Sequence, residues 1–297
     1  MKPARQRDSD RRLGVLRSCL GALLACVAIA RTGGAGWANQ PATTPTGDTI
    51  RYPSGSVQIE TYVVRPSTPG AHPAVIVVHD DLGLNEAVRS IAQIFARAGF
   101  VAVAPNLASR GGTQLPPVSG TQGAGTLNRL GLSPTQTVTD LVAAFRFLQQ
   151  DEGVDASKIS AVGLGWGGYR VWKMAEQLQA LHRGVVFYGV TPTEDEVARI
   201  TTPFLGHYAQ YDFILTASVL KTKKQLGEKF TYHIYPTTHG FFGGGSAGSA
   251  LDIAALAGEV DLYALEADKK AERVTPSKGD ARPARLALER TLAFLRN

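Results

Sequence analysis

The sequence is organised around residues 158–170, KISAVGLGWGGYR. The first half is a short apolar run that predicts a buried strand, and a helical pattern follows the glycines. Within the turn, Gly163 and Gly167 stand two residues to either side of Gly165. A strand, a tight turn and a helix with glycines at these places is the layout of a nucleophile elbow, which pushes a catalytic side chain into a site. Because Gly165 occupies the central place, the motif is present without its nucleophile.

Strand and helix patterns alternate on both sides of this turn. Apolar or alternating runs predict strands at residues 57–64, 74–78, 100–104, 159–162, 184–189, 203–208 and 230–235. Helical spacing predicts helices at residues 88–98, 133–148, 169–181, 218–226 and 284–296, and residues 193–199 predict a short helix or a turn. This alternation predicts an α/β fold in one domain, with a mostly parallel sheet and helices on both faces.

Two long segments lack a clear period. Residues 109–132 are rich in Gly, Pro, Thr and Gln, and residues 243–282 are rich in Gly, Ala, Asp and Lys. We expect the second segment to contain one helix, around residues 250–265. Long loops inside a compact domain either belong to a site or lack a fixed structure, and the sequence leaves both open.

The first 38 residues have the pattern of an export signal. A basic start precedes an apolar stretch, residues 18–30, that is shorter than the roughly 20 residues of a spanning helix. Residues 36–38, Gly-Trp-Ala, then offer small residues for cleavage. The pair Arg11-Arg12 leaves twin-arginine export open beside ordinary secretion. Residues 23–26 loosely match a lipoprotein box, so lipid anchoring is a further alternative.

We therefore predict a signal peptide at 1–38, a flexible lead-in at 39–48 and a folded domain at 49–297. The protein is expected to be periplasmic or secreted, with no membrane span. Seven basic and two acidic residues in the first 38 account for most of the net charge of +6, so the remainder gives no reason to expect nucleic acid as a partner. Both cysteines, Cys19 and Cys26, also lie there, so the rest of the chain has no thiol nucleophile and no Cys-based metal site. The histidines show no metal-ligand spacing, and we expect neither a metal nor a cofactor.

Polar residues stand at several predicted strand ends. Asp80 and Asp81 follow one strand, Gly165 another, and Asp212 and His239 two later strands. Ligands of such sheets bind beyond the carboxyl ends of the strands, and elbow, Asp, His is the chain order of hydrolase triads. Each residue also has a structural interpretation: a solvated turn for the Asp pair, a helix cap for Asp212 and a satisfied loop histidine for His239.

The same segments resemble the dienelactone hydrolase (carboxymethylenebutenolidase) family of the α/β-hydrolase fold, over about residues 57–242 and the final helix. The motifs that carry the resemblance are VHDDLGLN at 78–85, APNL at 104–107, VGLGWGG at 162–168, YAQYD at 208–212 and YPTTHGF at 235–241.

The resemblance implies a role for several residues of this chain. Asp212 and His239 match the triad acid and base, and Asp80 matches a Glu that contacts the nucleophile. The backbone N–H groups of Asp81 and Trp166 match the oxyanion hole.

A further match is Arg110, which falls where the family has a carboxylate-binding arginine. Its place at the mouth of a long loop favours a surface residue over a ligand clamp. The chain departs from the family at Gly165, which replaces the nucleophilic cysteine, and at about Gly243, where a second substrate-binding arginine is absent. The second departure argues against dienelactone itself as the substrate.

Three functions remain open on the sequence. The first is hydrolysis of a small ester or lactone, with His239, oriented by Asp212, acting as general base on water. The second is non-catalytic binding of an ester, lactone or other small organic acid on the same fold, which the missing nucleophile favours. The third is an interaction module that uses the two long segments.

Overall fold

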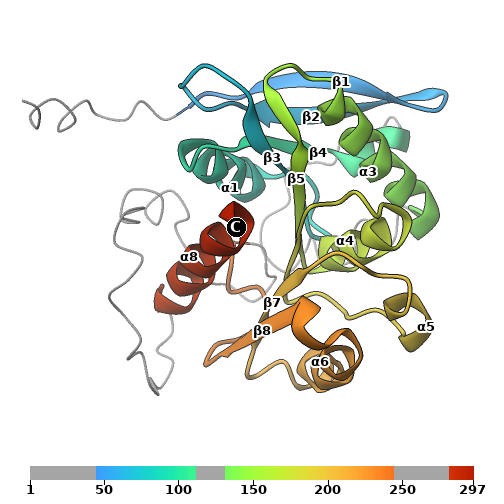
Figure 1. Ribbon diagram of the computed structural model, residues 1–297, viewed down its shortest axis with the longest axis vertical. Coiled ribbons are helices and arrows are strands. Elements are labelled where there is room, and N and C mark those ends of the chain that lie inside the picture. Colours follow the sequence, from blue (N-terminus) through green and yellow to red (C-terminus); the bar gives the residue numbers. More distant parts are fainter. Residues whose placement is uncertain (1–44, 112–130, 244–280) are drawn as a thin grey trace, which may run out of the picture. The chain divides into compact units, whose positions relative to one another are not determined.

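The computed structural model describes residues 45–111, 131–243 and 281–297 (Figure 1). They belong to one compact unit, Thr44–Asn297. The predicted signal peptide, the lead-in up to residue 44 and the predicted helix at 250–265 lie outside the described residues, as does most of the two long segments. In the part of the chain that is described, no helix is long and apolar enough to cross a membrane.

An eight-stranded sheet with the order β1-β2-β4-β3-β5-β6-β7-β8 forms the centre of the fold. The strands are β1 (Asp48–Ser54), β2 (Val57–Val64), β3 (His72–Val78), β4 (Val101–Pro105), β5 (Val154–Leu164), β6 (Gly184–Phe187), β7 (Phe204–Ala209) and β8 (Phe230–Tyr235). β2 is antiparallel to both neighbours, and every pair from β4 to β8 is parallel. The predicted mostly parallel sheet is therefore confirmed.

Helices cover both faces of this sheet, also as predicted (Figure 1). One face packs against α1 (Glu86–Arg97) and α8 (Arg282–Arg296). The other packs against α3 (Pro134–Gln149), α4 (Trp166–Gln177) and α6 (Phe213–Leu226). Shorter helical segments are η1 (Leu107–Gly111), α5 (Glu194–Val197) and η3 (Gly227–Lys229).

The β-branched run of β3 shows why a continuous apolar strand lies at the centre. Val75 and Val77 face the α1 and α8 side, whereas Ile76 and Val78 face the α3 and α4 side, and all four are 0% exposed. Side chains alternate along a strand, so a strand covered on both faces must be apolar at every position. Burying each such side chain contributes roughly 1.5–3 kcal/mol.

The edge strand β1 was not expected from the sequence. It pairs antiparallel with β2, from Asp48 opposite Val63 to Ser54 opposite Val57. Gly55 makes the tight turn between them at φ 62°, a conformation that glycine adopts without a steric penalty. Asp48, the predicted end of the flexible lead-in, is the first residue of this strand.

Two predicted helix starts need correction. α6 begins at Phe213 rather than at residue 218. α4 begins at Trp166 and ends at Gln177, rather than running over 169–181. α3 does follow Ser133 at the N-cap, with Pro134 in the first turn, but the Ser133 side chain makes no capping hydrogen bond. Thr137 Oγ1 instead donates to the carbonyl oxygens of Ser133 (3.2 Å) and Pro134 (3.0 Å). Ser133 and Gln136 have the spacing of a capping box, but no such box forms at the start of α3 among the described residues.

Candidate active site

Gly165 forms the turn between β5 and α4. Its backbone has φ 46° and ψ −110°, in the region that side chains of L-residues disfavour. The turn is held by hydrogen bonds from the Gly165 N–H to the Phe187 carbonyl oxygen (2.9 Å) and from the Gly168 N–H to the Gly165 carbonyl oxygen (3.0 Å). The local geometry is thus that of the strained strand–turn–helix expected from the sequence.

The glycines of this turn differ in the space around them. A Cβ atom on Gly163 would lie 2.6 Å from the Gly167 carbonyl oxygen, and one on Gly167 would lie 2.4 Å from the His79 carbonyl oxygen. Both distances are shorter than atomic contact allows, so these glycines let the backbones of β3, β5 and α4 approach closely. A Cβ atom on Gly165 would instead meet the described residues at ordinary contact, 3.5 Å from Asp80 Cβ and 3.6 Å from Tyr188 Cε2.

Asp212 and His239 come together after β7 and β8. His239 Nδ1 lies 2.5 Å from Asp212 Oδ2. A carboxylate only accepts hydrogen bonds, so Nδ1 donates and the neutral ring keeps Nε2 as a proton acceptor. The His239 side chain is 45% exposed and that of Asp212 is 16% exposed. Asp212 is also the N-cap residue of α6, yet its side chain makes no capping hydrogen bond within the described part of the chain.

Asp80 lies at the end of β3 and is 3% exposed. Its Oδ1 accepts a hydrogen bond from the Leu82 N–H (2.9 Å), whereas its Oδ2 is buried and has no hydrogen-bond partner among the described residues. Burial disfavours the charged carboxylate and raises the pKa of Asp80 to about 7, against the lowering effect of the Leu82 N–H. The side chain therefore changes between neutral and charged forms near neutral pH.

Tyr188 joins the elbow to the histidine, and sequence reasoning missed it. The sequence predicts a strand over 184–189, but β6 ends at Phe187 and Tyr188 adopts φ 40°. It is the one non-glycine residue in the described part of the chain with positive φ. Its ring packs edge to face on His239, with the centroids 5.0 Å apart, and its hydroxyl donates to the Phe242 carbonyl oxygen (2.8 Å). Strained backbone conformations cluster at functional sites. No pattern in the local sequence predicts the positive φ of Tyr188.

The predicted oxyanion groups lie at the ends of β3 and β5. Asp81 follows Asp80 directly, and Trp166 is the first residue of α4, where backbone N–H groups face out of the helix terminus. The Trp166 ring stacks on His79, with centroids 5.8 Å apart, and the Arg170 guanidinium lies 3.5 Å from the centre of that ring. These contacts hold the first turn of α4 against the end of β3. The oxyanion role itself stays a prediction.

His79 ties this region together without acting as a site residue. It is fully buried, and burial lowers its pKa to about 4, so the ring is neutral at pH 7. Nε2 accepts from the Leu107 N–H (3.2 Å), which leaves Nδ1 to donate to the Asp80 carbonyl oxygen (2.8 Å). These two hydrogen bonds give His79 a structural role.

Arg110 has a partner of its own within the fold. Its Nε donates to Asp140 Oδ2 (2.8 Å) and its Nη2 to Asp140 Oδ1 (2.7 Å). The Asp140 side chain is 0% exposed, and the bidentate bond raises the pKa of Arg110. The guanidinium therefore neutralises a buried carboxylate and ties η1 to α3. The predicted role of Arg110 in substrate binding stays a prediction.

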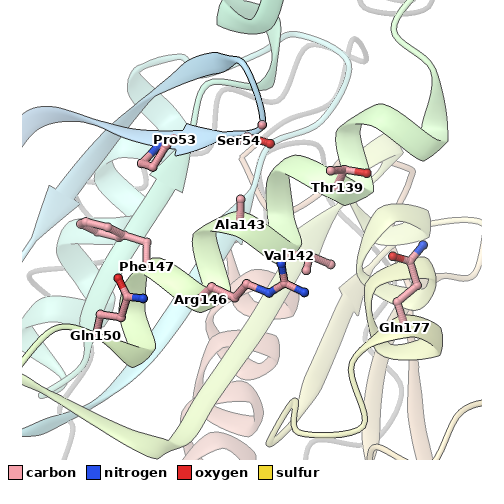
Figure 2. Close-up of a pocket in the computed structure, with 10 residues that line it drawn as sticks. Pro53, Ser54, Thr139, Val142, Ala143, Arg146, Phe147, Gln150 and Gln177 are labelled. Atoms are coloured by element: carbon pink, nitrogen blue, oxygen red, sulfur yellow. The ribbon is translucent and has the colours of Figure 1, made fainter.

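A surface groove of about 410 Å³ lies elsewhere, between the β1–β2 turn, α3 and the end of α4 (Figure 2). Its walls include Arg146, Phe147, Gln150 and Gln177, and none of the site residues predicted from the sequence lines it. Within the described ranges, no group of three or more His, Cys, Asp or Glu side chains is placed to hold a metal ion.

Comparisons with known proteins agree with this architecture. The profile of the dienelactone hydrolase family matches residues 59–295. A putative carboxymethylenebutenolidase of Methylorubrum extorquens is 25% identical over 201 residues, covering 63% of this chain and 69% of the relative. Another, of Saccharolobus solfataricus, is 29% identical over 236 residues, covering 65% of this chain and 88% of the relative.

Among solved structures, a putative dienelactone hydrolase from Klebsiella pneumoniae matches with a TM-score of 0.64 at 19% identity. The match covers 86% of this chain and 100% of that one. At this identity the likeness concerns the fold, and it confirms the predicted α/β-hydrolase architecture.

Proposed function

Because the chain belongs to the dienelactone hydrolase family, we propose that it hydrolyses a small ester or lactone with His239 as general base on a water molecule. The family is one of hydrolases with small-molecule substrates, which supports the reaction class. The observation that carries the proposal is the 2.5 Å contact between His239 Nδ1 and Asp212 Oδ2, in a site that also contains the elbow turn.

The proposed reaction uses groups that remain in this chain. The water oxygen attacks the carbonyl carbon while His239 Nε2 takes its proton, and Asp212 stabilises the resulting imidazolium. The backbone N–H groups of Asp81 and Trp166 are proposed to bind the developing oxyanion. When the intermediate collapses, His239 returns the proton to the leaving alkoxide or, in a lactone, to the ring oxygen.

Backbone donors do not depend on a nucleophile side chain. In serine proteases that lose a triad member, the oxyanion hole and substrate binding alone leave a rate roughly 10³–10⁴ above that in water. We therefore expect slow turnover that depends on His239, with no covalent intermediate on the protein.

A non-catalytic binder is the alternative, and Gly165 favours it because the residue offers no nucleophile. The Asp212–His239 pair favours hydrolysis, because a protein that only holds a small organic acid has no evident need for an acid-oriented base. The two proposals make opposite predictions for turnover.

Short esters and lactones, tested on residues 39–297 with His239→Ala as the control, separate them. Hydrolysis is expected to exceed that of the control, and in ¹⁸O-labelled water a single turnover is expected to place the label directly in the acid product. Ligand binding without any turnover above His239→Ala would support the binder and contradict the hydrolase.

We also propose that the first 38 residues direct export to the periplasm or the medium. The support is the order of a basic start, a short apolar stretch and a small-residue cleavage site.

A further inference from the structure

We infer that Tyr188 is a positioning residue, whose ring fixes the orientation of the His239 imidazole and so holds Nε2 ready to accept a proton. The inference rests on the proposed function, because a fixed orientation of that nitrogen matters for a general base. It adds to Asp212 a second group that holds His239. It also gives a reason for the strained backbone of Tyr188, which the hydrolytic chemistry alone does not explain.

The first support is the side of the sheet to which Tyr188 turns. Along β6, Val185 and Phe187 pack on the α1 and α8 side and Val186 packs on the opposite side, as alternation along a strand requires. Continued alternation would place residue 188 on the side of Val186. Tyr188 instead packs on the same side as Phe187, and its φ of 40° accompanies this break in the pattern. A positive φ costs free energy in a residue with a side chain, so the surrounding fold must hold Tyr188 in this conformation.

The second support is that both ends of Tyr188 are fixed. Its backbone N–H donates to the His207 carbonyl oxygen in β7 (2.7 Å), and its hydroxyl donates to the Phe242 carbonyl oxygen (2.8 Å). The residue is 1% exposed, and its ring packs edge to face on the Phe241 ring, with the centroids 5.6 Å apart. Tyr188 therefore connects β7 to the segment that follows His239, and its ring has little freedom to turn.

The third support is the contact between this fixed ring and His239. The two rings pack edge to face, with the centroids 5.0 Å apart and an interplanar angle of 62°. The contact of Nδ1 with Asp212 holds one atom of the imidazole and leaves the ring able to rotate about that contact. Tyr188 blocks this rotation on one side, and it is the one aromatic ring that packs on His239 in the described part of the chain. Because the His239 side chain is 45% exposed, solvent borders much of its remaining surface.

Two contacts therefore define the orientation of the base. Asp212 selects the tautomer, and Tyr188 restricts the rotation of the ring. A misplacement of about 1 Å in a reacting group can lower a rate roughly 10²-fold, so the loss of this restriction should affect the chemical step. A residue that only fills the core would affect stability instead, and this difference can be measured.

The kinetic test compares Tyr188→Leu, which removes the ring and keeps an apolar side chain, with Tyr208→Leu as the matched control. Tyr208 is also fully buried, but it packs on the α3 and α4 side, and its hydroxyl has no hydrogen-bond partner among the described residues. With p-nitrophenyl acetate, at a temperature where both variants are folded, Tyr188→Leu is expected to lower kcat about tenfold to a hundredfold and to change KM less than about twofold. Tyr208→Leu is expected to keep kcat within about twofold of the unmodified protein.

The orientation itself is measured by ¹⁵N NMR of the histidine side chains, which needs no turnover. At a pH where the ring is neutral, the His239 signal, identified by its loss in His239→Ala, is expected to show the Nδ1–H tautomer in the unmodified protein. Tyr208→Leu and Tyr188→Phe, which keeps the ring, are expected to show the same tautomer. Tyr188→Leu is expected to show a mixture of both tautomers, because a ring that can rotate leaves Asp212 part of the time.

The outcomes separate this inference from the proposed function. Unchanged kcat and an unchanged tautomer in folded Tyr188→Leu would overturn the inference and leave the hydrolase standing. A tautomer mixture in Tyr188→Leu, without turnover above His239→Ala in the unmodified protein, would support the orienting role of Tyr188 and contradict the hydrolase. Where Tyr188→Leu does not fold, the unmodified protein decides. Nuclear Overhauser contacts between the Tyr188 and His239 rings, together with a single Nδ1–H tautomer, would support the inference, and the absence of these contacts would overturn it.

Discussion

Replacing Gly165 by Ser is the most informative perturbation of this protein. It restores a side-chain nucleophile to a turn that already has elbow geometry, next to a His239–Asp212 pair with a 2.5 Å contact. The Cβ atom meets its nearest described neighbours at 3.5 Å or more, so no steric overlap opposes the substitution. The cost that remains is the backbone conformation.

That cost follows from the φ of 46° at Gly165. A non-glycine residue held in an unfavourable conformation loses roughly 1–3 kcal/mol, out of about 5–15 kcal/mol for a domain. At roughly 2–4 °C per kcal/mol for a unit of this size, we expect Tm to fall by roughly 2–12 °C. Gly163→Ala is the matched control, because its Cβ atom would lie 2.6 Å from a backbone oxygen and should cost more.

The activity of Gly165→Ser should exceed that of the unmodified protein on p-nitrophenyl acetate. We expect a burst of p-nitrophenol and a protein whose mass has risen by one acetyl group, because Ser activated by His forms a covalent intermediate. Both signals should vanish when His239→Ala is added. A folded Gly165→Ser protein with neither burst nor acetylation would show that His239 and Asp212 do not work as a base and its orienting acid.

Three further predictions concern stability and export. The pKa of Asp80 is about 7 in the folded protein against 3.8 as a free side chain, so its proton is held more tightly when folded and stability falls as pH rises from about 4 through 7. Asp80→Asn should therefore raise the unfolding free energy by up to about 4 kcal/mol at pH 8 and by little at pH 4 in urea titrations; equal effects at both pH values would contradict this. Arg110→Ala should cost about 3–5 kcal/mol, because it leaves the buried Asp140 carboxylate unpaired, and a second change, Asp140→Leu, should recover part of the loss; a cost below about 1 kcal/mol would refute the pairing. Exported protein should begin near Asn39 by intact mass, and a lipid-bearing start at Cys26 would overturn that prediction.

The central strands and their order along the chain were predictable because their composition is dictated by burial on both faces. The uninterrupted apolar run from Val75 to Val78 indicated a strand covered on both faces, and the spacing of the glycines indicated the turn at Gly165. The gathering of the polar residues that follow these strands was also predictable, because the carboxyl ends of parallel strands lie at one edge of the sheet. The contact between Asp212 and His239 then follows from the neighbouring positions of β7 and β8.

Other features depend on contacts between distant residues and were missed. The edge strand β1 is half exposed and contains Pro53, which obscures its alternation, although the turn at Gly55 offered a hairpin signal. The Arg110–Asp140 pair joins residues 30 positions apart, and nothing in the local sequence of either one indicates the other. Tyr188 has a strained backbone that only the surrounding fold imposes.

The position of Asp212 bears on the choice between hydrolase and binder. An aspartate at a helix N-cap normally accepts a hydrogen bond from the first turn, which contributes about 1 kcal/mol. Among the described residues, the Asp212 side chain makes no such bond and accepts from His239 instead, whose own side chain is 45% exposed. An ion pair or hydrogen bond with so exposed a partner adds little stability. The fold thus forgoes a stabilising cap for a contact whose main physical effect is to orient an imidazole, and that preference favours catalysis over simple binding.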